Sequence, residues 1–179
     1  MRILVVGGGG REHAIVHKLS QSPSRPELYC APGNGGISRL ATCAPIAATD
    51  LPGMLAYAKA QRIDLVVVAQ DDPLALGMVD LMEENGIPAF GPTAAAAQIE
   101  ASKVFSKHLM KRYGIPSAAY EVFDDPEAAK AYIRAQGAPI VVKADGLALG
   151  KGVIVAQSVE EAEAAVDDMM VRAAFGQAG

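Results

Sequence analysis

The stretch RILVVGGGGREHAIVHKLS, residues 2–20, decides the fold of the first part of the chain. Its first five residues form a short apolar run rich in β-branched side chains, which is typical of a buried strand. Four glycines at 7–10 end this run, and a helical pattern follows over residues 11–20. A glycine turn between a strand and a helix frees backbone N–H groups to point at an anion, at the positive end of the helix dipole. The stretch therefore predicts an α/β fold with a phosphate site at its first turn.

Strand and helix signals continue to alternate up to residue 90. We expect further strands at residues 27–31, 64–69 and 87–90, and helices at 51–61 and 73–86. Asp50 can cap the first of these helices, and the second has Pro73 at its start and Gly86 at its end. The run DLVVVA, 64–69, has the apolar character of a strand buried on both faces. This alternation predicts a mostly parallel, Rossmann-like sheet with helices on both faces.

The stretch GPTAAAAQIEASK, residues 91–103, marks the predicted join between a domain at 1–100 and a second at 101–179. The second half predicts an α+β layer. Ser102 caps a helix that runs to residue 112, and Asp125 caps another that runs to 136. We expect a strand at 118–123 and a hairpin formed by strands 139–144 and 152–156. Ser158 and Glu161 predict a capping box for the last helix.

Composition excludes several classes of protein. The chain has 179 residues, of which 51% are hydrophobic and 20% charged, so it can form a core and is not disordered. A net charge of −4 argues against a nucleic-acid partner. Cys30 and Cys43 lack the spacing of a metal site, which favours two reduced thiols. With no signal peptide and no apolar run of about 20 residues, we expect a cytoplasmic protein without a membrane partner.

The glycine turn at 7–10 does not match the dinucleotide fingerprint G-x-G-x-x-G. The third glycine is missing, because the sixth position counted from Gly7 is Glu12 and counted from Gly8 is His13. The acidic residue expected at the end of the second strand is also missing, since that region reads LYCAPGNGG. The turn thus favours a phosphate and disfavours NAD, and a tight turn without a ligand is the alternative.

The stretch VVKADGLALGKGV, residues 141–153, contains a second glycine-rich loop. Its G-x-x-x-G-K pattern is one residue shorter than a P-loop, and Gly152 stands where a P-loop has Ser or Thr. A glycine-rich hairpin of this kind can close as a lid over a triphosphate, whose charge Lys143 and Lys151 would neutralise. A buried lysine without a role is the alternative for Lys143, and a merely exposed side chain is the alternative for Lys103.

Several segments together resemble phosphoribosylamine–glycine ligases, which are ATP-grasp enzymes of purine biosynthesis. The resemblance rests on ILVVGGGGREHAIVHKL, YCAPGNGG, IPAFGPTAAAAQIEASKVFSKHLMKRYGIP and VVKADGLALGKGV, which cover nearly the whole chain in the order of the family. It implies a pre-ATP-grasp domain at 1–100 and the first subdomain of an ATP-grasp domain from 101. It also implies a reaction in which glycine, 5-phosphoribosylamine and ATP give glycinamide ribonucleotide, ADP and phosphate through a glycyl phosphate.

The resemblance implies two groups of site residues. Residues implied to bind ATP are Lys103, Lys143, Asp145, Gly146, Gly150, Lys151 and Gly152. Residues implied to bind the substrate are Gly9, Gly10, Arg11, Glu12, Asn34 and Asp71. The cofactors implied are ATP and Mg²⁺ or Mn²⁺, with the metal ligands and the catalytic residues expected beyond residue 179.

The chain departs from the family in two respects. The segment AQDDPL, 69–74, stands where the family usually has GPEAPL, so Asp71 offers a carboxylate one methylene shorter. The segment after residue 153 offers no replacement for the expected metal ligands, so the chain resembles an N-terminal piece. We expect it to be inactive alone, and a steady, glycine-dependent release of ADP would contradict this expectation.

Three alternatives remain at this point. The first is another ATP-grasp carboxylate–amine ligase, which would share the lid and the lysines but not GGGGREHA followed by APGN. The second is a non-catalytic, Rossmann-type nucleotide-binding module, which binding of NADH would support. The third is a structural fragment that binds nothing.

Overall fold

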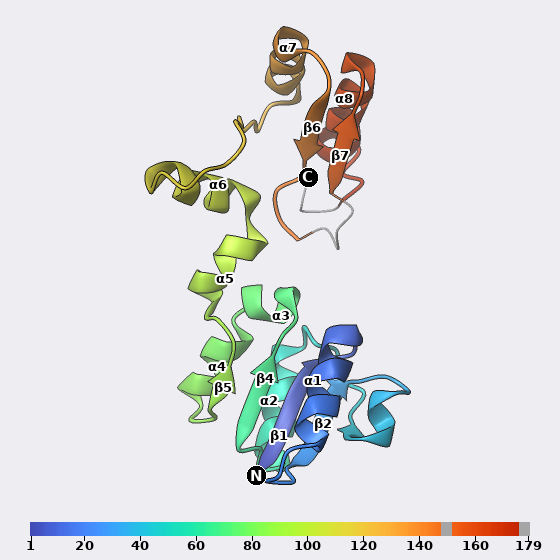
Figure 1. Ribbon diagram of the computed structural model, residues 1–179, viewed down its shortest axis with the longest axis vertical. Helices are drawn as coiled ribbons and strands as arrows, with labels where there is room; N and C mark the ends of the chain where they lie inside the picture. Colours follow the sequence, from blue (N-terminus) through green and yellow to red (C-terminus); the bar gives the residue numbers. More distant parts are fainter. Residues whose placement is uncertain (148–151, 176–179) are drawn as a thin grey trace. The chain divides into compact units, whose positions relative to one another are not determined.

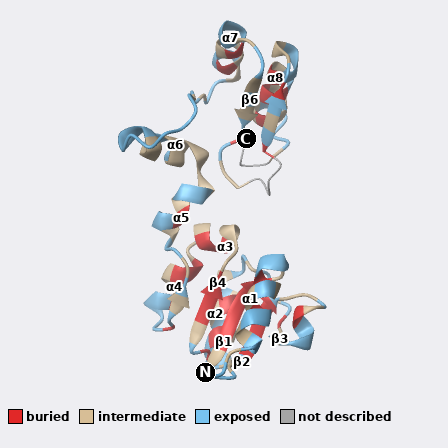
Figure 2. Cartoon of the chain, viewed as in Figure 1, coloured by how far each residue is buried: buried red, intermediate tan, exposed pale blue. Residues whose placement is uncertain are grey.

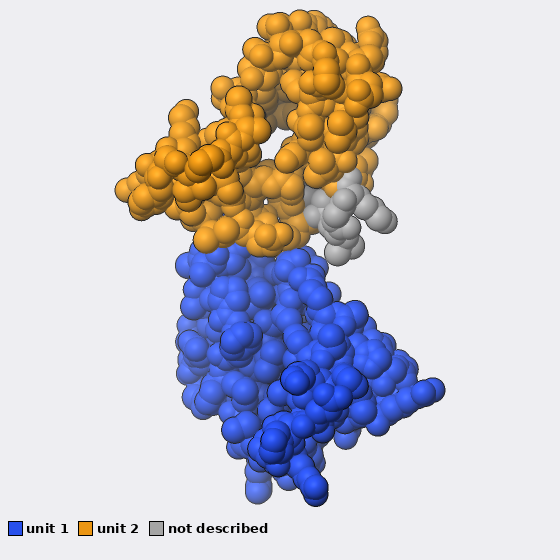
Figure 3. All heavy atoms as spheres, viewed as in Figure 1, with its two compact units in different colours: residues 1–98 blue, residues 99–179 orange. Residues whose placement is uncertain are grey.

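The computed structural model describes residues 1–147 and 152–175, so Gly150 and Lys151 of the second glycine loop lie outside the described residues. The chain forms two compact units, Met1–Gln98 and Ile99–Gly179 (Figure 3). Each unit has its own hydrophobic core, and each is described by itself below.

The first unit is built on a five-stranded parallel sheet in the order β3-β2-β1-β4-β5 (Figure 1). Its strands are β1 (Arg2–Gly7), β2 (Glu27–Pro32), β3 (Thr42–Cys43), β4 (Leu65–Val68) and β5 (Ala89–Phe90). The predicted parallel sheet is confirmed. The two-residue strand β3 was not predicted, because it is too short to show a period of two.

Helices cover both faces of this sheet, as predicted. On one face α1 (Gly10–Ser20) and the 3₁₀ helix η1 (Ile37–Arg39) pack on Ile3 and Val5. On the other face α2 (Leu51–Ala60) and α4 (Met78–Glu84) pack on Leu4 and Val6. Side chains alternate between the two cores along β1, which is why β1 and β4 are buried at every residue after their first (Figure 2).

The single helix predicted at 73–86 is wrong. The segment forms two helices, α3 (Asp71–Ala75) and α4, with Gly77 between them. Gly77 has φ +88°, a left-handed conformation that ends the first helix and that glycine adopts without a steric cost. The first helix also starts earlier than predicted: α3 begins at Asp71, three residues after the end of β4 and two residues before Pro73.

The predicted join at 91–103 also contains a helix, α5 (Ala94–Ala101). Its four consecutive alanines have the highest intrinsic helix propensity, which outweighs their small contribution to a core. The division between the two units falls within this helix, after Gln98.

The second unit contains α6 (Lys103–Arg112), α7 (Pro126–Gln136) and α8 (Val159–Val166), followed by one π-helical turn, η2 (Asp167–Val171). The caps predicted for these helices are confirmed, since Ser102, Asp125 and Ser158 accept hydrogen bonds from Phe105, Ala128 and Glu161 N–H. The reciprocal bond of the predicted capping box differs by one residue: Glu161 accepts from Gln157 N–H at 2.7 Å.

The predicted hairpin is confirmed as β6 (Ile140–Lys143) paired antiparallel with β7 (Val153–Ala156). The strand predicted at 118–123 is wrong, because this segment pairs with neither β6 nor β7. One face of the hairpin packs on Ala129, Ile133, Ala162 and Val166 of α7 and α8. The other face, with Val141, Lys143, Val153 and Val155, is exposed.

Two further expectations concern the state of the cysteines and the presence of membrane-spanning segments. Both cysteines are free, and Cys30 is buried in the core of the first unit. Of the helices that the structure describes, none is long and apolar enough to cross a membrane.

Candidate functional site

The candidate residues of the first unit gather at the carboxyl edge of its parallel sheet. The chain leaves β1 toward β2 on one side, and it later returns to the other side of β1 as β4. The carboxyl ends of β1 and β4 therefore form a topological switch point, the place where open α/β sheets bind their ligands. Gly8–Gly10 follow β1 at this point, and Gln70 and Asp71 follow β4.

Glu12 is the only charged residue that is fully buried in the described part of the chain, with 3% of its surface exposed. Its carboxylate folds back under the glycine turn, where Oε2 accepts a hydrogen bond of 2.6 Å from Gly9 N–H. This carboxylate lies at the N-terminus of α1, where the helix dipole favours negative charge. The sequence predicts that the amides of the glycine turn face an anion. The amide of Gly9 instead donates its hydrogen bond to Glu12 of the protein itself.

Gly7 and Gly8 make this arrangement possible. A Cβ on Gly7, which has φ +126°, would lie 2.6 Å from Glu12 Cγ. A Cβ on Gly8 would lie 2.5 Å from the Gly33 carbonyl oxygen. By contrast, a Cβ on Gly10 would meet nothing within 4 Å. The first two glycines are therefore required by packing, and Gly10 is open on its Cβ side.

Asn34 connects the loop after β2 to the glycine turn. Its Nδ2 donates to the Gly8 carbonyl at 2.9 Å, and its Oδ1 accepts from Gly36 and Ile37 N–H at 2.8 and 2.9 Å. Two more bonds to the Gly7 carbonyl, from Gly33 N–H at 3.0 Å and from Cys30 Sγ at 3.2 Å, strengthen the same contact. Since these bonds occupy the polar atoms of Asn34, its side chain shapes the site.

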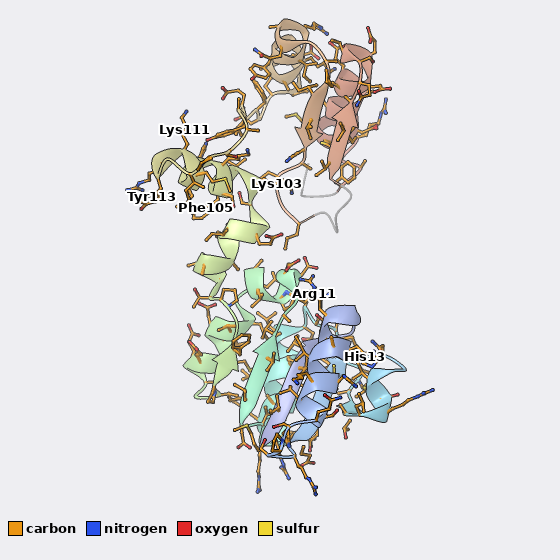
Figure 4. The ribbon with its side chains drawn as sticks, viewed as in Figure 1. Arg11, His13, Lys103, Phe105, Lys111 and Tyr113 are labelled. Carbon is orange, nitrogen blue, oxygen red and sulfur yellow. The ribbon has the colours of Figure 1, made fainter. Side chains whose placement is uncertain are left out.

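Arg11 and Asp71 face one another across the switch point. Arg11 Nη2 lies 3.5 Å from Asp71 Oδ2, and 66% of the Arg11 side chain is exposed. Figure 4 labels Arg11 at this edge of the first unit. Arg11 thus presents a cation beside the open amides at the start of α1. A planar guanidinium in this position suits a phosphate, to which it can donate two hydrogen bonds at once.

In the second unit, Asp145 joins the loop after β6 to the start of α6. Its carboxylate accepts from the Ser102 hydroxyl at 3.0 and 3.2 Å and from Val104 N–H at 3.1 Å. Lys103 points to the same loop, where its Nζ donates to the Gly146 carbonyl at 3.0 Å (Figure 4). The structure thus brings Lys103 to Asp145 and Gly146, although Lys103 and Gly146 are 43 positions apart in the sequence.

The other described residues implied to bind ATP, Lys143 and Gly152, belong to the hairpin of β6 and β7 or adjoin it. Lys143 is exposed on the open face of β6, opposite Val153, so the interpretation of Lys143 as a buried charge is wrong. The reason is the alternation of side chains along β6, which directs Val142 inward and Lys143 outward. Gly152 is buried, and its carbonyl accepts from Ala144 N–H at 2.9 Å.

Sequence reasoning missed two features of these sites. Gln70 was not singled out, although its amide oxygen is buried beside Gly7. Its place two residues after the end of a buried parallel strand is the signal that could have identified it. The bonds that Asp145 accepts from Ser102 and Val104 join residues 43 and 41 positions apart, and no local pattern predicts such a contact.

Within residues 1–147 and 152–175, no three His, Cys, Asp or Glu side chains come together in a group that could hold a metal ion.

Two family descriptions match the chain. Residues 1–100 match "Phosphoribosylglycinamide synthetase, N domain", and residues 101–179 match "Phosphoribosylglycinamide synthetase, ATP-grasp (A) domain". Among curated proteins, the phosphoribosylamine–glycine ligases of Yersinia pestis and Escherichia coli O157:H7 are 54% and 50% identical to it. Each match covers 100% of this chain and 42% of the relative, so the chain spans less than half the length of these proteins.

Solved structures agree with this result. The crystal structure of phosphoribosylamine–glycine ligase from Thermotoga maritima is 33% identical, with a TM-score of 0.69 over 92% of this chain and 38% of that chain. The biotin carboxylase domain of the Hydrogenobacter thermophilus 2-oxoglutarate carboxylase, solved with MgADP, has a TM-score of 0.74 at 20% identity, covering 99% of this chain and 42% of that chain. At this identity, the second likeness concerns the fold alone.

Proposed function

The chain belongs to the phosphoribosylglycinamide synthetase family, and from this premise we propose that it supplies the sugar-phosphate and ATP-phosphate sites of a phosphoribosylamine–glycine ligase. The reaction joins glycine to 5-phosphoribosylamine as ATP becomes ADP and phosphate. The observation that carries the proposal is the family match through both units, at 54% identity to a named ligase. It favours this ligase over a sister ATP-grasp enzyme and over a nucleotide-sensing module.

The first unit binds 5-phosphoribosylamine at the switch point between β1 and β4. Arg11 and the open amides at Gly10 and Arg11 receive the phosphate, since they combine a guanidinium with a helix N-terminus. The Asp71 carboxylate accepts hydrogen bonds from the sugar. Glu12 and Asn34 hold the glycine turn in shape through their bonds to Gly9 and Gly8.

The second unit binds the phosphates of ATP beside the exposed face of the hairpin. Lys103 and Lys143 supply positive charge, and residues Gly146–Gly152, with Lys151 among them, cover the phosphates. The Asp145 carboxylate holds this loop to the start of α6 through Ser102 and Val104. In this role Asp145 positions the loop and does not touch the nucleotide.

The chemistry proceeds in two steps. A carboxylate oxygen of glycine attacks the γ-phosphorus of ATP, the bond to the β,γ-bridging oxygen breaks, and ADP leaves. The amine of 5-phosphoribosylamine then attacks the carbonyl carbon of the glycyl phosphate, loses a proton, and displaces phosphate. Lysines near the transferred group stabilise the negative charge that develops on it, and a loop that closes over the phosphates excludes water.

Magnesium is implied by the family, where it neutralises charge on the transferred phosphoryl group. The described residues do not form a metal site of their own, so no step is assigned to magnesium on this chain.

The test is an amide NMR titration of the 179-residue chain with ribose 5-phosphate, Mg-ATP and NADH in turn. We expect ribose 5-phosphate to shift the amides of Gly8–Arg11 and Asp71, and Mg-ATP to shift those of Lys103, Lys143, Gly146 and Gly152. Arg11→Ala should abolish the first set of shifts and leave the second, whereas Lys18→Ala, at the far end of α1, should change neither. Shifts at Gly7–Gly10 with NADH alone would contradict the proposal.

A further inference from the structure

Two buried oxygen atoms at the switch point have no hydrogen-bond donor in the described structure. One is Oε1 of Glu12, whose other carboxylate oxygen is bound to Gly9 N–H. The second is Oε1 of Gln70, which lies two residues after the end of β4 and immediately before α3. A buried acceptor without a donor is costly, so such an atom in a native protein requires an explanation.

Both side chains lie against the same glycine. A Cβ built on Gly7 would lie 2.8 Å from the carboxyl carbon of Glu12 and 3.2 Å from Oε1 of Gln70. Glu12 reaches this point from α1, and Gln70 reaches it from the end of β4. The two side chains therefore approach the same point beside Gly7, from opposite sides of the switch point.

The two oxygen atoms are both hydrogen-bond acceptors and cannot bond to one another, but the side-chain amide of Gln70 also carries a donor, its NH₂ group. The oxygen and the NH₂ group of glutamine occupy nearly the same space, and rotation about the last side-chain torsion interchanges them. Gln70 is half-buried as a whole, and its Nε2 is not among the buried atoms that lack a partner. Rotation of the amide would place a donor beside Glu12 and move the oxygen toward water, so both oxygens would gain partners.

We propose that Gln70 Nε2 donates a hydrogen bond to Glu12 Oε1, and that these two residues position the ligand-binding turn. With the bond from Gly9 N–H to Glu12 Oε2, the pair forms a buried bridge from the end of β4 to the start of α1. The bridge fixes the direction of the Gly10 and Arg11 amides. Glu12 and Gln70 act through these amides and do not touch the ligand.

The second residue of the pair departs from the usual pattern of the family. In the pattern GPEAPL that the family resemblance brings to residues 69–74, the second position is proline, which offers no side-chain donor. The function of the bridge rests on the sugar-phosphate site proposed above, but the bond itself does not, so the two are tested separately.

The bond is tested by NMR on the unmutated chain with ¹⁵N-labelled side-chain amides. We expect one Nε2 proton of Gln70 to exchange with water slowly, whereas both amide protons of the exposed Gln157 should exchange fast. Glu12→Gln should shift the Gln70 amide and leave that of Gln157 unchanged. Equal exchange of the two side chains, together with no response to Glu12→Gln, would overturn the pairing whether or not the chain binds a sugar phosphate.

The positioning role is tested with Gln70→Met, which keeps the length of the side chain and removes its donor. We expect the affinity for ribose 5-phosphate to fall about tenfold, since small displacements of a binding group weaken its contacts strongly. The shifts that Mg-ATP causes in the second unit should stay as they are. If the unmutated chain binds ribose 5-phosphate and Gln70→Met binds it equally well, the positioning role is wrong. If the unmutated chain does not bind it, the proposed sugar-phosphate site is wrong instead.

Discussion

Arg11 Nη2 lies 3.5 Å from Asp71 Oδ2, so an ion pair links the first turn of α1 to the first residue of α3. The two residues are 60 positions apart, and the parallel pairing of β1 with β4 brings them to one edge of the sheet. This contact joins the two sides of the switch point at its surface. The proposed Glu12–Gln70 bond would join them below it.

Replacing Arg11 with alanine separates binding from stability. Because both side chains of the pair are substantially exposed, the loss should change the free energy of unfolding by less than about 1 kcal/mol. Affinity for ribose 5-phosphate should fall and lose much of its dependence on salt. Calorimetric titration at two salt concentrations, with Lys18→Ala as control, measures both effects. An unfolding energy lowered by several kcal/mol would show that the pair is mainly structural.

Gly8→Ala and Gly10→Ala should differ sharply in stability. A methyl group on Gly8 would lie 2.5 Å from the Gly33 carbonyl oxygen, a backbone atom that cannot move alone. The strain should destabilise the chain by about 1–3 kcal/mol. A methyl group on Gly10 would meet nothing within 4 Å. The free energy of unfolding of Gly10→Ala should therefore differ from that of the unmutated chain by less than about 0.5 kcal/mol. Urea unfolding of the two variants side by side makes the comparison, and equal midpoints would refute the packing argument.

Asp145→Ala removes the acceptor that holds the loop after β6 to α6. The Ser102 hydroxyl and Val104 N–H lose their partner, which should cost about 1 kcal/mol, as for the loss of a helix cap. Amide hydrogen exchange should become faster at Val104, and the ATP-induced shift at Gly146 should weaken. Asp124→Ala, at an exposed position, is the matched control. Unchanged exchange at Val104 would contradict the assignment.

Ile133→Ala tests the core of the second unit. Ile133 is 4% exposed and packs between the hairpin and α8, so its truncation should cost about 2–5 kcal/mol. Val155 lies on the open face of the hairpin and is 60% exposed, so Val155→Ala should lower the free energy of unfolding by less than about 0.5 kcal/mol. Thermal unfolding followed by circular dichroism distinguishes the two variants. A large loss for Val155→Ala would indicate that this face is covered in solution.

Burial raises the pKa of the Cys30 thiol to about 12. An unfolded thiol titrates near pH 9, so this residue's contribution to stability is complete below that pH and is lost as the pH rises toward 12. Iodoacetamide at pH 8 should therefore label the half-exposed Cys43 first and Cys30 only after unfolding. Mass spectrometry of the peptides gives the order, and early labelling of Cys30 would contradict its burial.

Much of the architecture follows from local signals in the sequence. The apolar runs at 2–6 and 64–69 specify the buried strands, and Asp50, Ser102, Asp125 and Ser158 each cap a helix because a short polar side chain satisfies the N–H groups that a helix leaves free. The hairpin of β6 and β7 follows from two β-branched runs around a glycine loop. Predictions failed where a glycine interrupted a helical pattern, as at Gly77, or where a strand would have needed a partner, as at 118–123.

By itself, then, the sequence determined the parallel sheet, the helices on both of its faces, the glycine turns and the family resemblance, because each depends on residues close together in the chain. Only the tertiary structure decided which distant residues meet: Arg11 with Asp71, Asn34 with Gly8, and Asp145 with Ser102. It also decided that Glu12 is buried and Lys143 exposed. These outcomes depend on strand order and on the direction of each side chain, and short-range patterns carry neither.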